Sequence, residues 1–313
     1  MFLLLALCTL IVWSVPGDYN HDLAALVNKR DMLNSAKSPR IIFIGGSNLI
    51  TLDSARLELE LKKTGNNYYS VINMGLWGGL SMERYLDELK PYLAPGDIVV
   101  ICQEYGTLLS SNFFKYIREN EEANEFFFLM KSRRSIVTDW QLVDIADDIK
   151  YIILLNQLKI KTYLHVLIDD NFAHIFTGGF YRYADNYTIH GDRKKSFKIM
   201  RPLGEQGARF EEPDAKNLLY LKNFACYGRA RNIRVFFSFP PFPEREYSLN
   251  KARIDSLVHV IGQDLGMVIL TMPGTTVYPE TCFADTVNHL QSRCERMRTA
   301  ALIKQLRIHM TLP

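Results

Sequence analysis

Three short apolar runs in the first third of the chain each end in glycine or polar residues, and helix-like segments separate them. The runs are 40–44, 69–73 and 97–102, and the segments between them are 53–63 and 81–90. Runs of this length with such endings are typical of buried strands that lead into tight turns. Strands that alternate with helices predict a parallel sheet with helices on both faces.

The same alternation returns in the last third of the chain. The pattern predicts helices at 214–229 and 248–264, strands at 233–239 and 267–270, and a last helix after His289. On this last helix Leu290, Cys294, Met297 and Ala301 fall on one face, which we expect to be buried. The whole pattern predicts an α/β fold with a flavodoxin-like parallel sheet in a three-layer α/β/α arrangement.

The middle of the chain breaks this pattern. Residues 108–212 are rich in Phe, Tyr and charged residues and show no clean alternation, although 139–158 looks helical. We expect this segment to be an insertion, or cap, over the sheet edge. The predicted domain therefore runs from 40 to 313 and contains an insertion at about 108–212.

The N-terminal segment 1–16 is almost wholly apolar and ends at Pro16-Gly17. A membrane-spanning helix needs about 20 apolar residues, and a signal peptide begins with basic residues that this segment lacks. Three interpretations stay open: a weak signal sequence, a membrane anchor whose start is missing, and a buried first helix. Export or anchoring is favoured. The polar segment 17–39 would then be a stalk, and the protein would be extracytoplasmic, either periplasmic or at the cell surface.

The composition excludes several classes of protein. Thirty-seven Lys and Arg against 34 Asp and Glu give a net charge of +3, too small an excess for a nucleic-acid binder. The five cysteines form no CxxC pair, which argues against a zinc site and a disulfide scaffold. Cys282 and Cys294 are either a disulfide formed after export or free buried thiols, and the second interpretation is preferred.

Residues suited to acyl transfer follow the predicted strands. Ligands of such sheets bind beyond the carboxyl ends of the strands. The residues expected there are Ser47, Asn73, Gly75, Gly78, Gly79, Gln103, Glu104, Tyr105, Asp285 and His289. A serine becomes a good nucleophile when a histidine takes its proton, and a carboxylate orients that histidine. Backbone N–H groups in glycine-rich turns stabilise the oxyanion.

Three segments resemble the sequence blocks of the SGNH/GDSL hydrolase superfamily. Phe43–Asn48 resembles the first block, Asn73–Gly78 the second, and Phe283–Leu290 the last. The resemblance implies that Ser47 is the nucleophile, His289 the general base and acid, and Asp285 its orienting partner. It also implies that the N–H groups of Ser47 and Gly78 receive the oxyanion, and that no cofactor is needed.

The chain departs from the superfamily pattern at three places. Gly46 stands where many members have Asp. The third block often has an Asn that donates to the oxyanion, whereas this chain has Gln103-Glu104-Tyr105-Gly106. Gln103 is a substitute donor, and Glu104 can donate only when protonated. Asp285 and His289 are four residues apart, where three is common. Asn48, Glu104 and Tyr105 are expected to contact the substrate.

The layout of the chain resembles membrane-anchored members of the superfamily that are linked to O-acetylation of polysaccharides or D-alanylation of teichoic acids, often beside a multi-span acyltransferase. The expected function is a serine-dependent ester hydrolase or O-acyltransferase acting on an extracytoplasmic glycan or another ester. The expected partners are that substrate, a membrane acyltransferase and the membrane itself through the N-terminus.

Other interpretations remain. One is a catalytically inactive scaffold of the same fold that binds glycan or recruits an acyltransferase. Another is a phosphate- or nucleotide-binding turn at Gly45-Gly46-Ser47. Rival acid–histidine pairs are Asp170 with His174 and His190 with Asp192, and a metal site from these histidines is a minor alternative. The basic stretch 193–195 is expected to be solvated or to meet anionic lipid or glycan.

Overall fold

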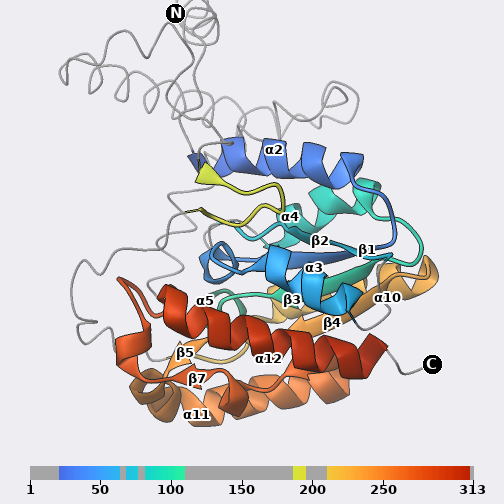
Figure 1. The fold of residues 1–313 in the computed structure, drawn as a ribbon. Coiled ribbons are helices and arrows are strands. Elements are labelled where there is room, and N and C mark those ends of the chain that lie inside the picture. Colours follow the sequence, from blue (N-terminus) through green and yellow to red (C-terminus); the bar gives the residue numbers. More distant parts are fainter. Residues whose placement is uncertain (1–20, 64–67, 77–81, 110–185, 195–209, 311–313) are drawn as a thin grey trace, which may run out of the picture. The chain divides into compact units, whose positions relative to one another are not determined.

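The computed structural model describes residues 21–63, 68–76, 82–109, 186–194 and 210–310 (Figure 1). The chain divides into two compact units, one of residues 28–117 and 184–313 and the other of residues 1–27 and 118–183. The sheet and the predicted triad belong to the first unit. Most of the second unit, the predicted anchor at 1–16 and the predicted helix at 139–158 lie outside the described residues.

The described residues form a five-stranded parallel sheet in the order β2-β1-β3-β4-β6. The strands are β1 (Arg40–Gly45), β2 (Ser70–Asn73), β3 (Ile98–Cys102), β4 (Arg234–Ser238) and β6 (Val268–Thr271). All five coincide with the predicted strands to within two residues at either end. The predicted α/β/α fold class is thus confirmed, and the strand order is the flavodoxin-like one.

The central strands are apolar at every position because both faces of the sheet are covered. Ile41 and Phe43 of β1 pack on one face with residues of α3 (Ser54–Lys62) and α12 (Ser292–Met310). The alternate residues Ile42 and Ile44 point to the other face and are equally buried. The helices α4 (Met82–Leu89) and α10 (Ala215–Ala230) lie behind the sheet in Figure 1 and contact each other.

The remaining elements connect or flank these strands and helices. They are α2 (His21–Ser35), η1 (Ser47–Leu49), η2 (Lys90–Tyr92), α5 (Tyr105–Leu108), β5 (Phe242–Pro243), α11 (Glu244–His259), η3 (Val260–Asp264), η4 (Pro273–Thr275), β7 (Val277–Tyr278) and η5 (Glu280–Cys282). Strands β5 and β7 pair in parallel as a small second sheet. That sheet follows the carboxyl ends of β4 and β6, so it brings the segment after β7 toward the edge where β1 ends.

The predicted stalk differs from the structure in its second half. Helix α2 reaches Ser35, and the ammonium of Lys29 on it is buried and donates to the carbonyl of Gly75 at 2.5 Å. Arg40 donates to the carbonyl of Leu33 and forms a buried ion pair with Asp97 at 2.5 Å. These contacts join α2 to the sheet. These contacts were not predicted because the helix is attached through polar groups, and a hydrophobicity pattern assigns polar residues to the solvent-exposed surface.

The last helix buries a different face from the predicted one. Cys294 is buried as expected, but Met297 is 55% exposed. Glu295, Arg298 and Thr299 are buried in its place. Among the helices in the described part of the chain, none is both long and apolar enough to cross a membrane.

Candidate active site

The turn of residues 45–48, called the nucleophile turn after the predicted role of Ser47, follows β1 directly and requires Gly45. A Cβ on Gly45 would lie 2.0 Å from the backbone carbonyl oxygen of Cys102, an approach that only glycine permits. A Cβ on Gly46 would lie 2.4 Å from the carboxyl of Glu104, so the Glu104 side chain would have to move. The turn continues into η1, which begins at Ser47, so the serine hydroxyl is held at the carboxyl end of the sheet.

The structure brings Ser47, His289 and Asp285 together. The Nε2 atom of His289 lies 2.7 Å from the Oγ of Ser47, and its Nδ1 lies 2.7 Å from the Oδ1 of Asp285. Ser47 is 8% exposed, so the hydroxyl is shielded but reachable. These distances and this order are those of a serine–histidine–carboxylate triad.

A compact loop explains how Asp285 and His289 meet at a spacing of four. The backbone N–H of Ala284 donates to the carbonyl of His289 at 2.9 Å, and Phe283 and Leu290 form an antiparallel bridge. The loop doubles back on itself, so the two side chains face each other across it without helical geometry. The unusual spacing is therefore compatible with the triad contact.

A disulfide closes the base of this loop. Cys282 and Cys294 are bonded at a sequence separation of 12, and they flank Asp285 and His289. The preferred interpretation of two free thiols was wrong. Sequence spacing could not decide it, because the two Cα atoms come to 5.6 Å only when the loop folds back onto α12.

Glu104 also contacts the nucleophile. Its Oε1 lies 2.8 Å from the Oγ of Ser47, and its Oε2 accepts a hydrogen bond from Nδ2 of Asn288 at 3.0 Å. The carboxyl is 3% exposed. Burial raises the pKa of Glu104, although hydrogen bonds from the Ser47 side chain and from the Asn48 and Ser47 amides oppose the rise. Because a carboxyl already meets these amides, the turn is a poor site for a phosphate.

His289 is held in its neutral form. Burial lowers the pKa of its imidazole, partly opposed by the hydrogen bond and charge of Asp285, and the charge of Arg193 lowers it further. A neutral imidazole whose Nδ1–H donates to Asp285 has a lone pair on Nε2. That lone pair faces Ser47, which is the arrangement a general base requires.

The turn after β2 is arranged around Asn73. Its Oδ1 accepts from the N–H of Gly75 at 2.7 Å, and its Nδ2 donates to the carbonyl of Leu49 at 2.7 Å. The N–H of Leu76 donates to the carbonyl of Gly45 at 3.1 Å, which joins this turn to the nucleophile turn. Gly78, the expected second oxyanion donor, lies outside the described residues.

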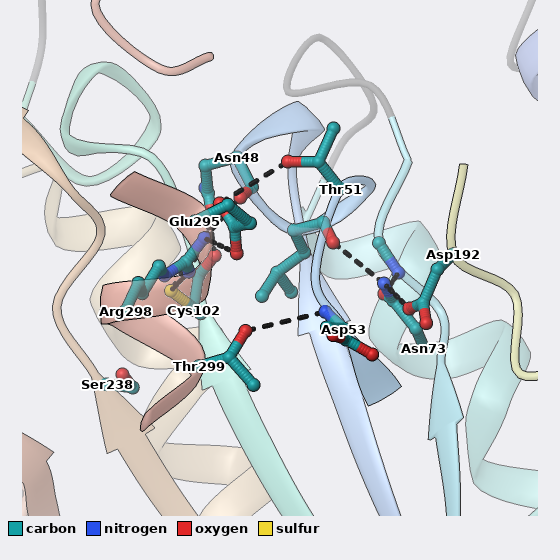
Figure 2. A network of polar contacts seen from close by, with 12 residues as sticks. Asn48, Thr51, Asp53, Asn73, Cys102, Asp192, Ser238, Glu295, Arg298 and Thr299 are labelled. Carbon is teal, nitrogen blue, oxygen red and sulfur yellow. Dashed lines mark hydrogen bonds and ion pairs between the residues drawn. The ribbon is translucent and has the colours of Figure 1, made fainter. Parts of the chain in front are cut away.

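A buried polar network that includes α12 holds the nucleophile turn in place (Figure 2). Arg298 of α12 donates to the backbone carbonyl and to the side-chain oxygen of Asn48, and its NH2 group lies 3.1 Å from the Sγ of Cys102. Glu295 lies 3.6 Å from Arg298 and accepts from the hydroxyl of Thr51 at 3.3 Å. Asn48, expected to contact substrate, is therefore held in this network and is 1% exposed.

Two other predicted residues are buried and are held by partners other than Ser47. The amide of Gln103 donates to the hydroxyl of Thr107 at 3.1 Å, so it is already engaged on α5. Tyr105 is 1% exposed, and its ring packs against Phe239 and Phe242. Both follow β3 as predicted, but their side chains serve the core and not an open pocket.

The rival pair His190 and Asp192 has a structural role. Asp192 accepts from the hydroxyl and the N–H of Ser54 at 2.7 and 2.8 Å and from Asn73 at 2.8 Å. The ring of His190 lies against the carbonyl of Val71 at 3.0 Å. Asp170 and His174 lie outside the described residues. Within the described ranges no three His, Cys, Asp or Glu side chains gather as a metal site would require.

The same unit of the chain contains an open groove of about 360 Å³, which none of the three triad residues lines. It is lined by the segments 51–53 and 192–194 and by the start of α12, including Ser292, Glu295 and Arg296. Arg193 belongs to this lining, and its charge also acts on His289. No pattern in the sequence indicates that the charge of Arg193 acts on His289.

Comparison with protein-family models found no match, and a search of curated proteins found no similar sequence.

Proposed function

We propose that this protein is a serine-dependent ester hydrolase or O-acyltransferase of the SGNH type. The observation that carries the proposal is the continuous contact from Asp285 through His289 to Ser47, with 2.7 Å at each step. The position of this chain of contacts at the carboxyl ends of a parallel sheet supports it, since ligands of such sheets bind there.

The residues account for acyl transfer in two steps. Ser47 Oγ attacks the acyl carbon while its proton passes to Nε2 of His289, and the departing alcohol then takes that proton as its bond to the acyl carbon breaks. Water or a sugar hydroxyl next loses a proton to the same nitrogen and attacks the acyl-serine. The bond between the acyl carbon and Oγ breaks, and His289 returns the proton to Oγ, which regenerates Ser47. Asp285 stabilises the imidazolium formed in both steps. The resemblance implies that the N–H groups of Ser47 and Gly78 receive the oxyanion, and the N–H of Ser47 would have to exchange its present contact with Glu104 for that role.

We propose an extracytoplasmic location and a glycan or other ester as substrate. The apolar segment 1–16 and the disulfide between Cys282 and Cys294 support export, because disulfides persist in oxidising compartments. An acylated glycan agrees with the polar lining of the groove, which carries both acidic and basic side chains. A membrane acyltransferase as partner rests on the resemblance alone.

The test is turnover of an activated acetyl ester, p-nitrophenyl acetate, by the purified full chain. The Ser47→Ala and His289→Ala variants should each lose about 10³-fold or more of the wild-type rate. Ser248→Ala and His259→Ala, on the exposed side of α11, are the matched controls and should retain it. Adding an oligosaccharide acceptor then separates hydrolysis from transfer by the ratio of free acetate to acetylated sugar. Equal rates in all five proteins would favour the inactive scaffold.

A further inference from the structure

The carboxyl of Glu104 contacts the hydroxyl of Ser47, which His289 also contacts. Its Oε1 lies 2.8 Å from the Oγ of Ser47, on which Nε2 of His289 also converges at 2.7 Å. The missing Cβ of Gly46 gives the carboxyl room, since a Cβ there would lie 2.4 Å from Oε1. Gly46 and Glu104 belong to two of the three departures from the superfamily pattern, and they are therefore one packing feature.

The number of protons in this chain of contacts limits its state. Ser47 carries one hydroxyl proton and has two partners within hydrogen-bond distance, Nε2 of His289 and Oε1 of Glu104. In one of these two hydrogen bonds the hydroxyl of Ser47 is the donor. In the other, Oγ of Ser47 is the acceptor, so His289 or Glu104 must supply the proton. Either His289 is an imidazolium beside an ionised Glu104, or His289 is neutral beside a protonated Glu104.

The second state is the one that prepares Ser47 for attack. Asp285 accepts the Nδ1 proton of His289, so a neutral ring presents a lone pair at Nε2 and accepts from Ser47. Glu104 must then donate. Its other oxygen already accepts from Asn288 at 3.0 Å, as the carbonyl oxygen of a carboxylic acid can.

We propose that Glu104 is a neutral carboxylic acid whose O–H donates a hydrogen bond to the Oγ of Ser47. This hydrogen bond directs the hydroxyl proton of Ser47 toward His289. This inference rests on the proposed function, because it assigns a role within the same reaction. It replaces the expected contact between Glu104 and the substrate.

The electrostatic surroundings agree with the neutral form. The carboxyl meets Gly46, Ser47 and Asn48 from the nucleophile turn and Asn288 from the loop of the triad, and none of these residues is charged. Two titratable groups are reached through these partners: His289 lies beyond Ser47, and Arg298 donates to the carbonyl of Asn48. Burial raises the pKa of Glu104 and lowers that of His289, so it favours the uncharged form of each. The hydrogen bonds that Glu104 accepts from Ser47 and Asn48 act against its uncharged form.

The neutral form also suits the reaction. As Oγ of Ser47 bonds to the acyl carbon, its proton moves to Nε2 of His289 and later to the leaving alcohol, whereas the proton of Glu104 stays on Glu104. The carboxyl lies beside the N–H of Ser47, where the oxyanion forms. A negative Glu104 would repel that oxyanion, and a protonated one does not. At a pH where Glu104 ionises, the hydroxyl of Ser47 turns to the carboxylate and activity falls.

The test compares Glu104→Gln with Glu104→Ala over a pH series. Glutamine keeps the shape of the acid, with an N–H₂ that faces Oγ of Ser47 and a C=O that accepts from Asn288. We expect the Gln variant to stay within about tenfold of the wild-type rate, without the fall in activity at high pH that Glu104 causes. The Ala variant should lose about 10²-fold or more. A Gln variant as inactive as the Ala variant, or one with the wild-type fall at high pH, overturns the inference.

A second readout does not depend on activity. The carboxylic-acid carbonyl band of Glu104 should be present in infrared spectra of the resting wild-type protein at neutral pH and absent in Glu104→Gln. Glu295→Gln and Glu246→Gln identify any bands of the other two buried glutamates in the described part of the chain. Glu244→Gln, on exposed α11, should leave the ester rate unchanged. If the wild type is inactive but shows the Glu104 band, the proposed function is wrong and the protonation state inferred for Glu104 still holds. An active wild type with Glu104 ionised at neutral pH defeats the inference alone.

Discussion

The imidazole of His289 lies 2.7 Å from the hydroxyl of Ser47, although 242 residues separate the two in the chain. Ser47 is placed by the first strand of the sheet, and His289 by a loop between β7 and α12. Two separate parts of the fold therefore converge on one proton transfer. The predictions below test the groups that position each side.

Asp285 should matter for the rate and not for the fold. In Asp285→Asn the amide N–H₂ can face Nδ1 of His289, which favours the wrong tautomer for accepting from Ser47. We expect the rate of ester turnover to fall by about 10²–10⁴-fold with little change in melting temperature. Asp255→Asn on α11 is the matched control. A turnover rate close to that of the wild type would remove Asp285 from the mechanism.

The disulfide should stabilise the loop that carries Asp285 and His289. Replacing Cys282 and Cys294 together by serine opens a loop with a sequence separation of 12 and should lower the free energy of unfolding by about 3 kcal/mol. Ester turnover should fall as well, because the loop positions the base. Denaturant unfolding with and without reductant measures the first effect. Cys226→Ser, at an exposed free cysteine, should show neither.

Replacing Arg298 alone should strongly destabilise the folded protein. Arg298→Met leaves the carbonyl of Asn48 without this donor and the carboxyl of Glu295 without its buried cation. We expect a loss of about 3–5 kcal/mol in the free energy of unfolding. The double variant with Glu295→Met should lose clearly less than the sum of the two single losses. Arg253→Met, in an exposed ion pair with Glu212, should cost less than about 1 kcal/mol.

Glu295 should make the protein less stable as the pH rises. Burial raises its pKa from 4.5 to about 7, partly opposed by Arg298, so between these values the folded state binds a proton that the unfolded state has lost. Stability therefore falls through this range and levels off above it. From below pH 4.5 to above pH 7, the wild type should lose about 3 kcal/mol more than Glu295→Gln. Parallel pH profiles in denaturant unfolding would contradict this.

The sheet was predictable from the sequence because its strands are buried on both faces. Such strands, including 40–44 and 97–102, appear as continuous apolar runs that end at glycines or polar residues. The same reasoning placed Ser47, Asp285 and His289 at one edge of the sheet, since parallel strands end together. The contacts between these three residues follow from the order of the elements and from the way the loop 283–290 doubles back on itself.

The parts that the sequence did not predict depend on buried polar groups. The buried face of α12 contains Glu295 and Arg298, which compensate each other, so a search for apolar spacing selected Met297 instead. Lys29 of α2 was assigned to a solvated stalk for the same reason. The contact between Glu104 and Ser47 could not be foreseen, because it depends on the missing Cβ of Gly46.

The most direct test of the central claim is covalent labelling of the folded full-length chain with a fluorophosphonate, followed by mass spectrometry of its peptides. Our account predicts one adduct on Ser47 with loss of fluoride, strongly reduced labelling in His289→Ala, and no adduct at this position in Ser47→Ala. Ser248→Ala should label like the wild type. A folded wild-type protein that stays unlabelled, or that is labelled equally in His289→Ala, would contradict an activated serine at this position.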